Sequence, residues 1–134
     1  MNRFYYVFIN GLDMYAFKTK FQPETDVDFS VSEENSGEEL CYWRKHPNLH
    51  GWMENLYDQK GGTEEFNCVN VKLNLEDLDA LERDLNSSRL PQTSGFFFGA
   101  SDGSIDEINF DLQFVKDARE AINQGYTVYY TSWW

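Results

Sequence analysis

Short runs rich in aromatic and β-branched side chains alternate along the chain with longer stretches whose apolar residues recur at helical spacing. Residues 3–9 and 13–18 are two such β-rich runs, and Asn10-Gly11 stands between them. Asn-Gly in this position favours a hairpin, because glycine tolerates a positive φ. The beginning of the chain therefore predicts two strands joined by a tight turn.

A polar stretch follows these strands. Asp, Glu, Ser, Asn and Gly dominate residues 22–40, with Glu33-Glu34 and Glu38-Glu39 as doublets. This composition predicts a solvated acidic loop, with a short strand around residues 27–31. An acidic segment that recognises a partner is the alternative.

Three amphipathic stretches predict helices. The first begins near Pro47, which suits the first turn of a helix, and ends at Gly61-Gly62. The second begins at Asn74, a good N-cap, and the third ends at Gly125. The apolar residues that follow helical spacing are Leu49, Trp52, Met53 and Leu56 in the first, Leu75, Leu78, Leu81 and Leu85 in the second, and Ile108, Leu112, Val115, Ala118 and Ile122 in the third.

The remaining apolar runs predict strands. Residues 66–73 alternate in polarity, residues 95–99 form a short apolar run between glycines, and residues 126–134 are β-rich. The resulting order is β-β-α-β-α-β-α-β. It predicts a single small α+β domain over residues 1–134, with a mixed or mostly antiparallel sheet and about three helices packed on one face.

Composition narrows the classes of partner. The chain has 11 Lys and Arg against 23 Asp and Glu, and its net charge of -12 weighs against long nucleic acids and anionic membranes. No run is apolar enough to span a bilayer, and no signal peptide is recognisable, so the cytoplasm is the expected location.

Cys41 and Cys68 are far apart, which predicts two free thiols; one disulfide is the alternative.

Cationic and aromatic residues gather in residues 42–53, although cations are scarce elsewhere. A guanidinium and an ammonium beside a helix N-terminus suit an anion, and indole rings suit a planar group. We therefore expect a binding site for a small phosphorylated ligand, or for a protein partner. Its predicted residues are Trp43, Arg44, Lys45, His50, Trp52, Tyr130 and Trp133. The alternative is that the Trp residues are core and the cations pair with nearby carboxylates.

Catalysis and metal binding have weaker signals. His46, His50 and Glu54 are spaced four apart, as on one helix face, but Pro47 interrupts the first interval, so they are only weak metal candidates. No P-loop, dinucleotide-binding glycine motif, nucleophile elbow or zinc-protease motif occurs, and no cofactor is expected. His50 with a carboxylate is the candidate acid–base group if the protein is an enzyme.

Several motifs recur in the order of a known family. They are Tyr42-Trp43-Arg44-Lys45, Leu49-His50, Trp52, Leu90-Pro91, Gly95-Phe96-Phe97-Phe98-Gly99, Tyr129-Tyr130 and Ser132-Trp133. This pattern resembles a family of small tailed-phage proteins that are often labelled phosphoglycerate kinase. At 134 residues the chain is far too short for that enzyme, so the label does not apply. The family usually has Asn at Pro47 and Phe at Met53. The resemblance implies a phage context and the host cytoplasm, but no reaction.

Three functions stay open on these observations. The first is a non-enzymatic, counter-defence type of protein that binds a phosphorylated ligand such as a nucleotide signal. The second is an acidic inhibitor that docks on a host nucleic-acid-binding or defence protein. The third is a small nucleotide hydrolase acting through His50. The two terminal Trp residues also make a second copy of the chain an expected partner. The first function requires the predicted residues to surround one cavity.

Overall fold

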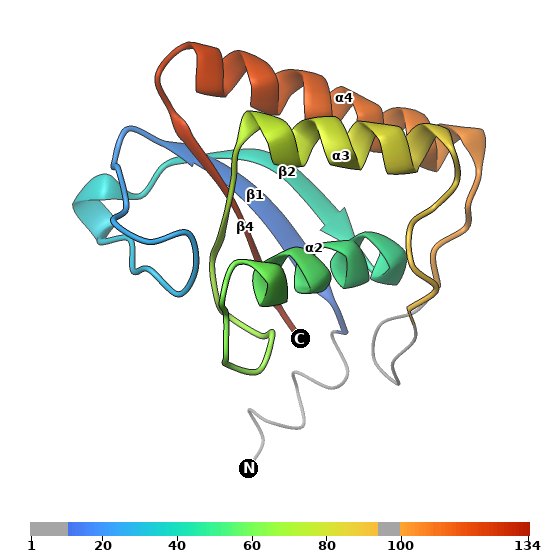
Figure 1. Cartoon of the computed structure of the whole chain (residues 1–134), viewed down its shortest axis with the longest axis horizontal. Coiled ribbons are helices and arrows are strands. Elements are labelled where there is room, and N and C mark those ends of the chain that lie inside the picture. Colours follow the sequence, from blue (N-terminus) through green and yellow to red (C-terminus); the bar gives the residue numbers. More distant parts are fainter. Residues whose placement is uncertain (1–10, 94–99) are drawn as a thin grey trace.

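The computed structural model describes residues 11–93 and 100–134. Helices and strands account for most of this part of the chain (Figure 1). The elements are β1 (Asp13–Thr19), the short 3-10 helix η1 (Glu33–Asn35), β2 (Glu38–Arg44), α2 (Pro47–Gln59), β3 (Val71–Leu73), α3 (Leu75–Asn86), α4 (Ile105–Asn123) and β4 (Thr127–Trp133). The predicted strands at residues 3–9 and 95–99 lie outside the described residues.

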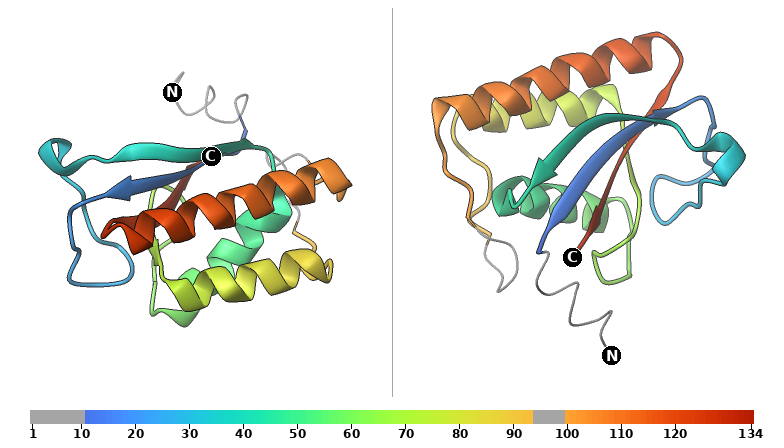
Figure 2. Two further views of the ribbon diagram at one scale, coloured as in Figure 1. Left: turned by 90° about the horizontal axis from the view of Figure 1, so that it is seen from above. Right: turned by 180° about the vertical axis from the view of Figure 1, so that it is seen from behind.

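The strands form one antiparallel sheet in the order β2-β1-β4-β3. Helices α2, α3 and α4 all lie on the same side of it (Figure 2). The predicted α+β domain with helices on one face is therefore confirmed. Strand β1 has β2 along one edge and β4 along the other. The first arm of the predicted hairpin across Asn10-Gly11 lies outside the described residues.

Local sequence signals explain where the helices begin and end. At the start of α3, the Asn74 side chain accepts a hydrogen bond from the Asp77 amide, and the Asp77 carboxylate accepts one from the Asn74 amide. At the start of α4, the Ser104 hydroxyl accepts from the Glu107 amide. After α4 the chain turns at Gly125 with φ of 93°, a conformation that favours glycine.

Three predicted stretches of chain differ from the structure. Strand β2 includes Glu38 and Glu39, which had been assigned to the acidic loop. An edge strand tolerates such residues, because one of its faces and one of its edges meet solvent. The strand predicted at residues 66–73 is confined to Val71–Leu73, and the one predicted around residues 27–31 is reduced to a single bridge between Val27 and Val71.

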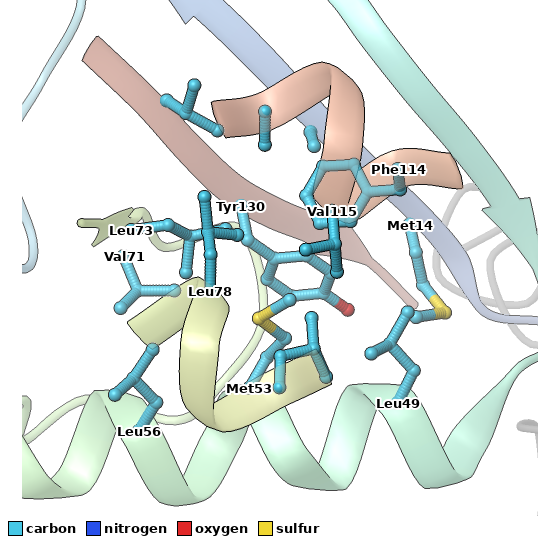
Figure 3. Packing of buried hydrophobic residues seen from close by; sticks show 14 of the residues in the cluster. Met14, Leu49, Met53, Leu56, Val71, Leu73, Leu78, Phe114, Val115 and Tyr130 are labelled. Carbon is cyan, nitrogen blue, oxygen red and sulfur yellow. The ribbon is translucent and has the colours of Figure 1, made fainter. Parts of the chain in front are cut away.

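The core lies between the sheet and the three helices, where Tyr130 of β4 points towards α2 (Figure 3). Side chains of the sheet form one side of the core, and side chains of the helices form the other. These buried side chains include Met14, Val71, Leu73 and Tyr130 from the sheet, and Leu49, Met53, Leu78, Phe114 and Val115 from the helices. Because β-strand side chains alternate, the residues between them face away from the helices. The sheet therefore has a second face, formed by every other residue.

Among the described residues, no helix is both long and apolar enough to cross a bilayer. Cys41 and Cys68 are free thiols, as predicted.

Candidate functional site

The structure distributes the predicted site residues over different surfaces rather than around one cavity. Trp43, His50 and Tyr130 are buried in the core. Arg44 and Trp133 lie on the sheet face that points away from the helices. Trp52 is half-buried, and its indole Nε1 donates a hydrogen bond of 2.9 Å to the Asp84 carboxylate of α3. One surface cavity brings Trp43, Arg44 and Lys45 together, but the other four predicted residues do not line it.

His50 belongs to a polar pair inside the core. Its Nδ1 lies 2.7 Å from the Tyr130 hydroxyl, and its ring centroid lies 4.9 Å from that of Phe66. Burial lowers the pKa of His50 from 6.5 to about 4 and raises the pKa of Tyr130 well above 10.0. His50 is only 1% exposed. Acid–base chemistry at this ring would require the core to open.

The three metal candidates have other surroundings. Both ring nitrogens of His46 are hydrogen-bonded, to Ser101 and to Asp111, and His50 contacts Tyr130. Glu54 is exposed on α2. In the part of the chain that the structure describes, no group of three or more His, Cys, Asp or Glu residues could hold a metal ion.

A hydrogen-bonded cluster that the sequence analysis did not predict joins β2, the start of α2 and α4. Asp111 is 1% exposed, and its two carboxylate oxygens accept hydrogen bonds from Trp43 Nε1 at 2.9 Å and from His46 Nε2 at 2.7 Å. Buried carboxylates require such partners, because desolvation otherwise disfavours the charge strongly. Asp111 lies three residues after Ile108 and four before Val115, so its place on the apolar stripe of α4 was a usable signal.

The sheet face away from the helices carries rows of aromatic and charged residues. Asp13 pairs with Arg44 on one side and with Trp133 on the other, so these three side chains form a row across β2, β1 and β4. In the next row Tyr15 lies between Tyr42 and Thr131. Cross-strand neighbours point to the same face, because pleating places paired residues on the same side.

The rings on this face contact one another. Centroids lie 5.1 Å apart for Tyr15 and Tyr42, 5.8 Å for Tyr15 and Phe17, and 5.6 Å for Phe17 and Tyr129. Tyr42 and Trp133 are the most exposed, at 38% and 44%. We call Tyr15, Phe17, Tyr42, Tyr129 and Trp133 the aromatic sheet face. Tyr42 and Trp133 offer surfaces on which another ring can stack, whereas Tyr129 is buried and Phe29 packs edge-on against it.

Charges flank the aromatic sheet face. The Tyr42 hydroxyl donates a hydrogen bond of 2.7 Å to the Asp13 carboxylate, which raises the pKa of Tyr42 to about 12. Arg44 is exposed and lies near enough to oppose part of that increase. Lys45 follows with φ of 56° at the turn into α2. A guanidinium, a fixed carboxylate and several rings therefore share one end of the sheet.

Comparison with known proteins does not identify a relative. No protein-family model matches the chain, and neither characterised proteins nor solved structures show significant similarity to it.

Proposed function

We propose that the protein binds a small phosphorylated ligand with a planar ring, such as a nucleotide, on the aromatic sheet face, and that it does so without converting the ligand. The observation that supports this proposal is the cross-strand row of Arg44, Asp13 and Trp133 beside the row of Tyr42 and Tyr15. The row unites two of the predicted binding residues, although they are 89 positions apart in the sequence.

Each group on this face can contact a different part of a nucleotide. Trp133 and Tyr42 offer exposed rings on which a base can stack, and such stacking contributes about 1–3 kcal/mol per base. Arg44 can hold a phosphate with two parallel hydrogen bonds. Asp13 can accept a hydrogen bond from a ribose hydroxyl or a base amine. The net charge of -12 favours a mononucleotide over a long nucleic acid, whose many phosphates it would repel.

The location follows from the same proposal. If the resemblance to tailed-phage proteins is correct, the ligand is encountered in the host cytoplasm, where sequestering a nucleotide signal would serve counter-defence. Binding rather than turnover is proposed, because His50 is enclosed in the core. The nucleotide should accordingly be recovered intact after incubation with the protein.

The experiment is a thermal-shift and calorimetric titration with mononucleotides and cyclic nucleotides at low and at physiological salt. A ligand that binds only the folded state raises the melting temperature. Arg44→Ala and Trp133→Ala should each remove the shift. Arg83→Ala on α3 is the matched control, because Arg83 is exposed and lies on a helix rather than on the sheet face.

The acidic-inhibitor alternative makes a different prediction for the same variants. If the aromatic sheet face instead contacts a basic host protein, nucleotides shift nothing, and a purified basic partner binds with an affinity that falls as salt rises. A complete panel of nucleotides without effect on the wild-type protein would refute the ligand proposal.

A further inference from the structure

A second arrangement of reactive side chains lies on the helix side of the sheet. Ser101 Oγ is 2.7 Å from His46 Nδ1, and His46 Nε2 is 2.7 Å from the Asp111 carboxylate. The serine comes from the segment before α4, the histidine from the N-cap of α2 and the aspartate from α4 itself. A hydroxyl, an imidazole and a carboxylate thus form one hydrogen-bonded chain of the kind that activates serine nucleophiles, with the roles of the two ring nitrogens exchanged relative to the Ser-His-Asp triad of serine proteases.

The chemistry of the groups sets the direction of each hydrogen bond. A carboxylate only accepts, so His46 Nε2 carries the proton that is donated to Asp111. When the ring is neutral, His46 Nδ1 is the acceptor and the Ser101 hydroxyl donates to it. The Ser101 oxygen in turn accepts a hydrogen bond of 3.0 Å from the Asn48 amide in the first turn of α2. Every donor in the chain has one acceptor.

One helix N-terminus favours negative charge on the serine oxygen. The N-terminus of α2, a helix of 13 residues, presents the Asn48 amide to Ser101 Oγ, and a helix N-terminus carries a partial positive charge. Asp111 is itself held by Trp43 Nε1, which fixes the carboxylate that orients His46. His46 is buried whereas Ser101 is partly exposed. His46 is therefore shielded from solvent, whereas a substrate can reach Ser101.

We propose that Ser101 is a nucleophile for acyl transfer, with His46 as its general base and Asp111 as the residue that positions His46. Ser101 Oγ attacks the carbonyl carbon of an ester and its proton passes to His46 Nδ1. The bond from carbon to the leaving alcohol breaks, and the alcohol takes that proton. Water then hydrolyses the acyl-serine, which releases the acid and restores the hydroxyl. This activity is independent of ligand binding on the aromatic sheet face.

The charges near Ser101 indicate the class of substrate. Surface cavities of about 430 and about 190 Å³ both border Glu107 and Asp111. Glu107 Oε2 lies 3.7 Å from His46 Nδ1, and the larger cavity has Asp102 and Asp106 at its wall together with Arg44 and Lys45. Glu107 would repel an anionic acyl group, and Arg44 and Lys45 would repel a cationic one. Neutral esters are therefore the expected substrates.

The first test measures covalent labelling of the wild-type protein by a neutral fluorophosphonate, and peptide mapping locates the adduct. The second test measures hydrolysis of neutral, cationic and anionic para-nitrophenyl esters. We expect one adduct per chain on Ser101, and slower hydrolysis of the anionic and cationic esters than of the neutral one. Ser101→Ala should abolish both reactions. His46→Gln should lower the labelling rate by about 100-fold or more, because general-base catalysis contributes that much.

Ser104→Ala is the matched control. Its hydroxyl also accepts an amide hydrogen bond from the first turn of a helix, so it should reproduce a loss of capping without a loss of labelling. Circular dichroism of each variant checks folding. If Ser101 serves only to cap α2, the folded wild-type protein stays unlabelled at high probe concentration, and the proposal is wrong. Equal labelling of wild type and Ser101→Ala would overturn it as well.

Discussion

Protonation of His50 should make the stability of the protein strongly dependent on pH. Burial lowers the pKa of His50 from 6.5 to about 4 in the folded protein. Between these values the unfolded chain binds a proton that the folded protein does not. The free energy of unfolding therefore rises with pH across this window and falls as the solution is acidified through it. Above it, the ring is neutral in both states and contributes no pH dependence.

The size of the effect follows from the same pKa. A change from 6.5 to about 4 corresponds to about 3 kcal/mol, since a tenfold change in proton affinity is about 1.4 kcal/mol. No discount for solvent screening applies, because the ring is 1% exposed. This amount is a large fraction of the roughly 5–15 kcal/mol that stabilises a typical domain. Acidification from neutral pH to about pH 4 should therefore remove about 3 kcal/mol of stability through His50 alone.

Urea denaturation of wild type and His50→Gln at a series of pH values between about 4 and 7.5 measures this contribution. Glutamine retains an amide that can bond the Tyr130 hydroxyl but does not titrate. The carboxylates and His46 are common to both proteins, so the difference between the two curves isolates His50. The wild-type curve should lose about 3 kcal/mol more than the variant on acidification. Parallel curves, or an NMR titration of the His50 ring near its ordinary pKa, would refute the reasoning.

Three further predictions follow from burial and packing. Met53→Ala should lower the free energy of unfolding by about 2–5 kcal/mol in urea, because Met53 is fully buried in the core. Gly51→Ala should lower the melting temperature, because the alanine Cβ would clash with Thr93 Oγ1. This clash should outweigh the better helix propensity of alanine. An unchanged or higher melting temperature would contradict the prediction. In native protein, a thiol reagent should modify the exposed Cys68 first, because burial raises the pKa of Cys41 to about 12; denaturant should abolish the difference.

Most elements of the fold were predictable from local patterns. The apolar stripes of α2, α3 and α4 and the β-rich runs of β1 and β4 recur at the spacing of their secondary structure. Strand β2 was not predicted, because Glu38 and Glu39 are typical of a loop and only its place at the sheet edge makes them compatible with a strand. Residues 66–70 lack most of the sheet pairing that their alternation favoured.

The candidate site was predicted less well, because a site depends on which face of the sheet each side chain lies on as well as on its position in the sequence. Trp43 and Arg44 are adjacent in a strand, so one enters the core and the other faces away. Tyr130 and Trp133 are three apart in β4 and also point to opposite faces. Recognising both segments as strands would have separated these residues at once. The pairing of Arg44 with Trp133 across Asp13, however, depends on the order of the strands.

The sequence by itself determined which segments become helices or strands and which of their sides are apolar, because these properties depend on neighbours within one or two turns. Only the tertiary structure decided which distant groups meet. Trp43 reaches Asp111 across 68 positions, and His46 reaches Ser101 across 55. Such contacts arise from the packing of α4 and the preceding segment against β2 and α2, and no local periodicity specifies that packing.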